Sequence, residues 1–175
     1  MFPNIDRVLE RSESLLGRVE QHVPASNTAP DWTHFIAFRW RRDQTMFGRR
    51  GRLVGVAHPH VIRFADLKDI DEQKSRIETN TRQFVMGRTA NNVVLTGARG
   101  TGKSSLVKAA LQEFARQGLR LIEVDRADMV DLPEIADLVA GRPERFIIFS
   151  DDLSFEANDP GYKALKSVLD GGISA

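Results

Sequence analysis

The sequence predicts an α/β protein in which a parallel β-sheet is covered by helices. From residue 93 onward, short apolar segments alternate with amphipathic ones in the order strand, helix, strand, helix, strand. Short, continuous apolar runs are typical of parallel strands that are buried on both faces. A glycine-rich segment at 97–104 joins the first of these predicted strands to the helix that follows it. The length of 175 residues is consistent with one domain and a short appendage.

Hydrophobic periodicity places the elements along the chain. Predicted helices cover 4–21, 70–86, 103–117, 131–140 and 160–170. Predicted strands cover 33–41, 52–57, 93–96, 121–124 and 146–149. The composition of 24–31, PASNTAPD, indicates a linker. We therefore divide the chain into an N-terminal extension at 1–60, with a helix, a linker and a β-hairpin, and an α/β domain at 61–175.

Two local patterns refine these predictions. Ile36, Phe38 and Trp40 alternate with Arg39 and Arg41, which predicts a strand with one buried side. At the helix predicted over 131–140, Asp131 and Glu134 have the spacing of a capping box.

The composition excludes several classes of protein. Apolar residues make up 41% and charged residues 28%, which argues against a disordered or fibrous chain. The chain has no cysteine, so disulfides, thiolate zinc sites and cysteine nucleophiles are excluded. No apolar run approaches the roughly 20 residues that span a bilayer, and the N-terminus does not have the pattern of a secretory signal. We expect a soluble cytoplasmic protein with no membrane contact.

Charge is distributed unevenly, although Lys+Arg at 25 and Asp+Glu at 24 almost balance. The segment 39–52 carries six arginines and one aspartate, whereas 123–160 carries eleven acidic and three basic side chains. One interpretation is a basic face that packs near an acidic one, or two solvated surfaces. The other is that the arginines contact a phosphate-rich partner such as nucleic acid. His58 and His60 have the spacing of metal ligands, but without a third ligand a structural role is the preferred interpretation.

The segment 97–104, GARGTGKS, matches the phosphate-loop pattern G-x-x-x-x-G-K-[ST] in full. Glycines let the backbone turn tightly and bring its N–H groups against phosphate oxygens. The helix that begins at Lys103 adds the positive end of its dipole. Lys103 would lie between the β- and γ-phosphates, and Ser104 would offer a hydroxyl to Mg²⁺. The expected nucleotide-binding residues are Gly97, Ala98, Arg99, Gly100, Thr101, Gly102, Lys103, Ser104 and Ser105.

A second acidic motif follows the strand predicted at 146–149. Asp151 and Asp152 come at the carboxyl end of this strand, which is where α/β folds bind their ligands. We expect Asp151 to help hold Mg²⁺ and Asp152 to orient or deprotonate the attacking water, with Lys103 neutralising phosphate charge. The alternative for this pair is a helix cap in a loop.

Taken together, these motifs resemble those of AAA+ ATPases. Residues 62–70, IRFADLKDI, are similar to the segment that helps to line the adenine pocket in that superfamily, and the resemblance implies that Ile70 contacts adenine. More narrowly, NNVVLTGARGTGKSSLVKA, GLRLIEV, LPEIADLVAGRPERFIIFSDDLSFE and YKALKSVLDGGI resemble the uncharacterised bacterial DUF815 family, over most of 30–175.

The resemblance has two departures. The superfamily usually ends its second motif in Asp-Glu after a hydrophobic residue, whereas this chain has Ser150, Asp151 and Asp152. AAA+ modules also continue to a sensor strand, an arginine finger and a helical lid. In the resembling fold that sensor strand lies between the strands at 93–96 and 146–149. We therefore expect 61–175 to be a partial AAA+ domain, in a chain truncated after the second acidic motif.

Four functions follow as hypotheses. The first is an ATPase that couples MgATP binding and hydrolysis to conformational change, with ATP and Mg²⁺ as cofactors and homo-oligomeric assembly in the complete module. The second is a nucleotide-binding module without turnover. The third is an ATP-regulated, nucleic-acid-binding accessory protein that uses 39–52. The fourth is a small-molecule kinase, against which the AAA+-like segment 62–70 argues.

Overall fold

The computed structural model describes residues 29–45, 48–154 and 159–170. The helix predicted at 4–21 and most of the predicted linker lie outside these residues. The strands are β1 (Ala37–Thr45), β2 (Gly48–Gly55), β3 (Leu119–Glu123) and β4 (Arg145–Phe149). The helices are α2 (Asp71–Val85), α3 (Lys103–Phe114), α4 (Leu132–Val139) and α5 (Pro160–Leu169). Short 3₁₀ turns are η1 (Phe64–Asp66), η2 (Ala115–Gln117) and η3 (Arg126–Asp131).

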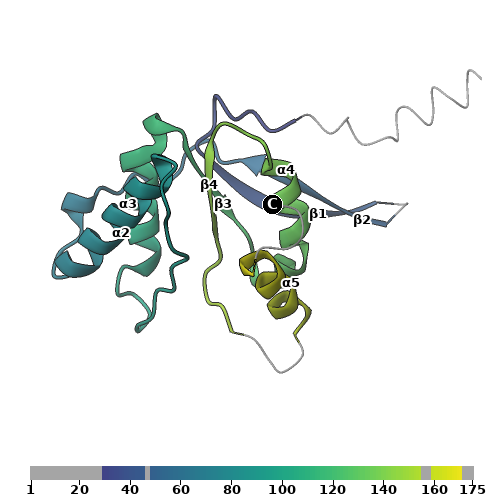
Figure 1. The fold of residues 1–175 in the computed structure, drawn as a ribbon. Coiled ribbons are helices and arrows are strands. Elements are labelled where there is room, and N and C mark those ends of the chain that lie inside the picture. The colour runs from purple at the N-terminus through teal and green to yellow at the C-terminus, as the bar shows by residue number, and fades with distance from the viewer. Residues whose placement is uncertain (1–28, 46–47, 155–158, 171–175) are drawn as a thin grey trace, which may run out of the picture.

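The four strands form a single, mostly parallel sheet in the order β2-β1-β3-β4. β1 pairs with β2 in an antiparallel hairpin, and β1–β3 and β3–β4 are parallel pairs. Helices α2 and α3 lie on one face of the sheet and α4 and α5 on the other, so the molecule has three layers (Figure 1). The predicted α/β class is therefore confirmed. The hairpin of the predicted N-terminal extension joins the same sheet as β3 and β4.

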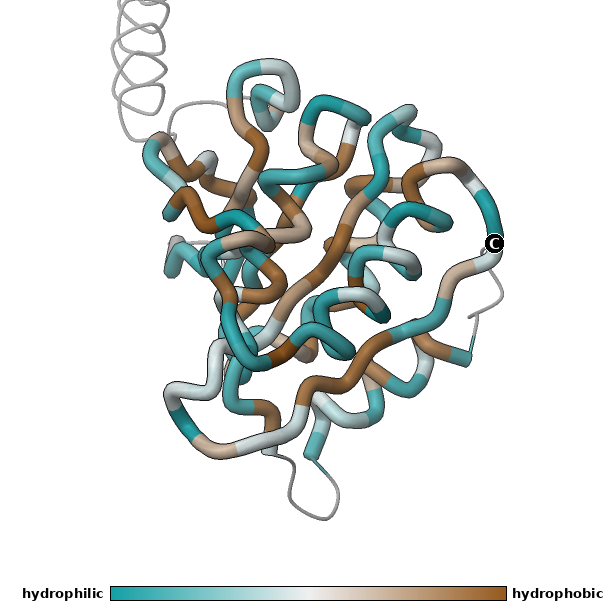
Figure 2. The backbone as a smooth tube through the Cα atoms, turned by 90° about the vertical axis from the view of Figure 1, so that its left-hand side faces the viewer, coloured by the Kyte–Doolittle hydropathy of each residue, from teal (hydrophilic) through white to brown (hydrophobic). Residues whose placement is uncertain are grey.

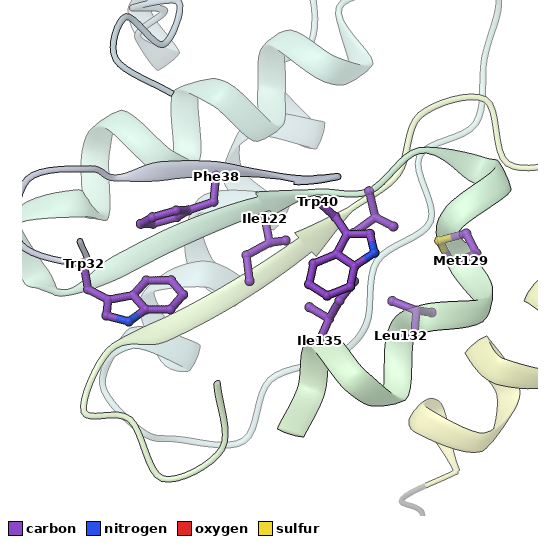
Figure 3. Close-up of a cluster of buried hydrophobic side chains, with 8 residues drawn as sticks. Trp32, Phe38, Trp40, Ile122, Met129, Leu132 and Ile135 are labelled. Atoms are coloured by element: carbon purple, nitrogen blue, oxygen red, sulfur yellow. The ribbon is translucent and has the colours of Figure 1, made fainter. Parts of the chain in front are cut away.

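The larger buried cluster fills the space between the sheet and the layer of η3, α4 and α5 (Figure 3). Phe38 and Trp40 of β1 are 1% and 0% exposed and meet Ile122 of β3 and Ile135 of α4. Trp32 lies 4.5 Å from Phe38, measured between ring centroids. Alternate residues of a strand face the same side, so the even-numbered residues of β1 supply this core.

A second cluster lies between the sheet and α2 and α3. Leu111 and Phe114 of α3 pack against Leu119 and Leu121 of β3, and Ala37 of β1 completes the buried set. Ile36 was predicted to share a side with Phe38, but it packs against this second cluster because it precedes β1. In Figure 2 a brown, hydrophobic stretch of backbone crosses the middle of the molecule, as expected for a buried strand.

The hairpin depends on one close approach of a ring to the backbone. Arg42 pairs with Gly51 across the hairpin, and a Cβ atom on Gly51 would lie 1.8 Å from the ring of Trp40. Because only glycine leaves room there, the indole covers the backbone of β2 directly. The predicted strands at 33–41 and 52–57 are confirmed as a hairpin, although both begin or end several residues away from the predicted bounds.

The prediction of a strand at 93–96 is wrong. Residues 91–96 have no regular secondary structure, and Val93 and Val94 are 49% and 86% exposed. A strand needs a hydrogen-bonded neighbour, and within the described residues β4 pairs with β3 alone and offers none to this segment. The apolar run alone therefore gave a misleading signal.

The capping box predicted at α4 is also absent. Asp131 is the N-cap residue, but its side chain makes no capping hydrogen bond. Its carboxylate instead accepts hydrogen bonds from Trp40 Nε1 at 2.9 Å and from the guanidinium of Arg42. The charged guanidinium of Arg42 is a stronger donor than a backbone N–H, so it binds the carboxylate that the sequence spacing assigned to the helix cap.

Candidate functional site

The glycine-rich loop at 97–102 ends where α3 begins. Gly97, Gly100 and Gly102 have φ angles of 142°, 83° and 85°. This left-handed region costs other residues roughly 1–2 kcal/mol, so the loop conformation favours glycine at these three positions. The N-cap residue of α3 is Gly102, which has no side chain to cap the helix. The first backbone N–H groups of the helix therefore stay available to an acceptor at the loop.

Two side chains bond to carbonyl groups of the same loop. Lys103 Nζ donates to the carbonyl oxygens of Gly97 and Ala98 at 3.0 and 2.9 Å. Thr101 Oγ1 donates to the Ala98 carbonyl at 2.8 Å. The ammonium group of Lys103 is thus hydrogen-bonded to two residues of the predicted nucleotide-binding loop. Arg99, between these bonded residues, is exposed.

The loop and the acidic motif meet at one hydrogen bond. Ser104 Oγ, in the first turn of α3, donates to Asp151 Oδ2 at 2.6 Å. The other carboxylate oxygen, Oδ1, accepts the backbone N–H of Asp152 at 3.1 Å. The structure thus brings together the two residues that the sequence nominated as metal ligands. Hydroxyl and carboxylate oxygens are the ligands that Mg²⁺ prefers, so this pair fits that ion.

Asp152 has a strained backbone. Its φ of 51° is in the left-handed region, where aspartate is tolerated better than most residues. Its side chain is exposed beside Asp151. At the preceding position, Ser150 Oγ is buried and has no hydrogen-bond partner among the described residues. Neither feature could be predicted from the sequence.

Ile70 lies at the start of α2, as its N-cap residue, and is half-buried. The neighbouring turn η1 packs against α3, so the segment 62–70 borders the layer that carries the loop. Its role as a base contact stays a prediction.

A polar clamp that sequence reasoning missed holds the chain leading to the loop. The side-chain amide of Asn80, on α2, donates to the carbonyl of Asn91 at 2.9 Å and accepts its N–H at 2.8 Å. This two-way bond fixes the segment six residues before Gly97.

Most of the arginines in 39–52 meet carboxylates. Arg39 Nη2 lies 2.7 Å from Glu123 Oε2, and Arg42 makes two bonds to Asp131 and lies 3.3 Å from Asp128. Arg41 forms an ion pair with Asp125, and Arg52 forms one with Asp43. The interpretation as a basic face packed near an acidic one is confirmed for Arg39, Arg41 and Arg42, which meet acids of 123–160, whereas Arg52 pairs with Asp43 of its own hairpin.

These pairs shift the ionisation of the acids in opposite directions. The hydrogen bonds from Arg42 lower the pKa of Asp131 most, and Trp40 adds to the effect. Burial raises the pKa of Asp128, and the nearby charge of Arg42 only partly opposes it. For Arg39, the hydrogen bond to Glu123 raises the pKa of the guanidinium.

Other candidate sites are weaker. Within the described part of the chain, no group of three histidine or acidic side chains is arranged to hold a metal. The structural role of His58 and His60 stays a prediction. No helix in those residues is long and apolar enough to cross a membrane.

Comparison with known proteins matches this chain to a family model. The model of the DUF815 family, described as a protein of unknown function, matches residues 33–175. No curated protein and no solved structure matches this chain. Because the match covers most of the sequence, including the glycine-rich loop and the acidic motif, this chain belongs to the DUF815 family.

Proposed function

We propose that this protein binds MgATP at the loop 97–104 and is an ATPase of AAA+ type. The observation that carries the proposal is the hydrogen bond between Ser104 and Asp151. A phosphate-loop hydroxyl and a carboxylate at the end of a neighbouring parallel strand are the two protein groups that hold Mg²⁺ in P-loop NTPases. The sheet, with its helices on both faces and with Asp151 and Asp152 just beyond the carboxyl end of β4, is compatible with that fold.

Each residue has a role in this proposal. The N–H groups of the loop and of the first turn of α3 bind phosphate oxygens. Lys103 exchanges its bonds with the carbonyls of Gly97 and Ala98 for the β- and γ-phosphates. Ser104 and Asp151 hold the metal, which neutralises phosphate charge when bound. Asp152 orients the attacking water, and Ile70 contacts the base.

Asp152 is one methylene shorter than the glutamate usual at this position, so its reach to water decides whether the site turns over. A nucleotide-binding module without turnover is the second candidate function. In the AAA+ proposal, an arginine from a neighbouring subunit completes the site, which makes hydrolysis depend on homo-oligomeric assembly.

Thermal unfolding and phosphate release on the same samples test the proposal. We expect MgATP and MgADP to raise the unfolding temperature of the wild-type chain, because a ligand that binds only the folded state stabilises it. Lys103→Ala should abolish the shift, whereas Lys163→Ala, an exposed lysine of α5, should keep it. Phosphate release that is lost in Asp152→Asn supports the ATPase, and its absence in the wild type supports the binding module. A folded wild-type chain with no shift would contradict both.

A further inference from the structure

The outer part of the β1–β2 hairpin is a two-stranded ribbon that leaves the main sheet. Only Ala37, Phe38 and Arg39 of β1 pair with β3, whereas β1 pairs with β2 as far as Thr45. Beyond Arg39 the two strands therefore continue without a third. In Figure 1 this hairpin extends past α4, away from the body of the molecule.

Arginines along this ribbon divide into held and available side chains. Close to the sheet, Arg42 is 21% exposed and is fixed by Asp131. Further out, Arg49 and Arg50 are exposed and have no ion-pair partner among the described residues. Across the hairpin they lie opposite Gln44 and Asp43. The free positive charge is thus at the outer end of the ribbon.

The two available arginines face opposite sides of the ribbon, because successive side chains of a strand alternate. Arg50 shares its side with Arg41 and Arg52, which lie directly opposite each other across the hairpin. The ion pairs of Arg41 and Arg52 are about half-exposed. Exposed pairs of this kind contribute about 0–1 kcal/mol, so a stronger anion can replace the carboxylates.

We propose that this ribbon binds double-stranded DNA through its phosphates. The major groove admits a two-stranded β-ribbon, and long arginine side chains at the outer end of the ribbon can then reach the phosphates that border the groove. The planar guanidinium matches the geometry of a phosphate. Arg49 and Arg50 make the principal contacts, and Arg41 and Arg52 add to them on one side.

Fluorescence anisotropy of a labelled, mixed-sequence DNA duplex tests this proposal. With two principal phosphate contacts, we expect affinity to fall by roughly tenfold between about 50 and 200 mM salt. The charge reversal Arg49→Glu with Arg50→Glu should remove binding. The matched control, Arg88→Glu with Arg116→Glu, changes the net charge equally at two exposed arginines outside the hairpin and should keep binding within about twofold of wild type. Circular dichroism verifies that both variants are folded.

Three results would overturn the proposal: no duplex binding by the wild type at low salt, an equal loss in both double variants, or equal affinity for poly-glutamate and DNA. The last would mean that the ribbon meets any polyanion, including an acidic protein surface. Lys103→Ala is expected to bind DNA normally, so this proposal and that of nucleotide binding fail independently.

Discussion

Ser104 Oγ donates a 2.6 Å hydrogen bond to Asp151 Oδ2 across 47 positions of sequence. This bond joins the first turn of α3 to the end of β4, and so links the helix layer to the sheet at the edge where parallel strands end. In the proposed function, these two side chains hold the divalent cation.

Removal of this hydroxyl separates its structural role from its proposed metal-binding role. Ser104→Ala should lower the free energy of unfolding by about 1 kcal/mol, because one hydrogen bond is lost. It should also weaken MgATP binding by at least about tenfold, because the metal loses a proposed ligand and the removal even of a group that only orients a ligand costs about 10–100-fold. Ser104→Thr keeps a hydroxyl and should behave as wild type. Equal MgATP affinity in the alanine and threonine variants would exclude Ser104 from the metal site.

The positive φ of Asp152 predicts a particular order of stabilities. Asp152→Ala should lower the free energy of unfolding by about 1 kcal/mol, because alanine has no polar side chain to support the left-handed conformation. Asp152→Asn should be close to neutral, since asparagine tolerates this region as well as aspartate does. Urea denaturation measures both. If alanine is as stable as asparagine there, the strain assigned to this residue is absent.

Asp131 makes stability depend on pH. Its pKa is lower in the folded state than in the unfolded state, where aspartate titrates near 3.9. Its ion pair therefore stabilises the fold fully above that unfolded value, and the contribution is lost as the pH falls through the folded-state pKa. Asp131→Asn should cost about 2 kcal/mol at pH 7, the scale of hydrogen bonds to a charged group.

Urea denaturation of wild type and Asp131→Asn from neutral to acidic pH measures this dependence. The difference between them should narrow below about pH 4. Asp137→Asn, an exposed aspartate of α4, serves as the control and should show little effect at any pH. A difference that stays constant on acidification would contradict the role of the Asp131 charge.

Gly51→Ala tests the contact between the hairpin and Trp40. A Cβ atom at Gly51 overlaps the indole, so the ring must move out of a fully buried position. Overpacking of this kind costs about 1–3 kcal/mol, and we expect a loss of that size in thermal unfolding. Gln44→Ala, at an exposed position on the same hairpin, should change stability by less than about 0.5 kcal/mol.

Elements that depend mainly on nearby residues, such as amphipathic helices and the glycine-rich loop, could be predicted from the sequence. α2 and α5 lie within about one residue of their predicted bounds, because their apolar residues repeat at helical spacing. The glycine positions of the loop were likewise readable, because a fixed motif requires them. Phe38 and Trp40 were correctly placed on the buried side of a strand.

Features that depend on strand neighbours could not be predicted in this way. Val93 and Val94 are residue types typical of strands, but no strand of the described structure pairs with them. The pairing of Arg39 with Glu123 follows from the register of β1 against β3, which no local pattern specifies. For the same reason, the sequence showed two charged segments without showing that three arginines of one meet acids of the other.

Isothermal titration calorimetry with MgATP tests the central claim most directly. The wild-type chain, shown to be folded by circular dichroism, should bind with micromolar affinity, about −8 kcal/mol. Lys103→Ala should show no measurable heat of binding, while Lys163→Ala should match the wild type. No binding by the folded wild-type chain, or equal binding by the Lys103→Ala variant, would contradict a nucleotide site at 97–104.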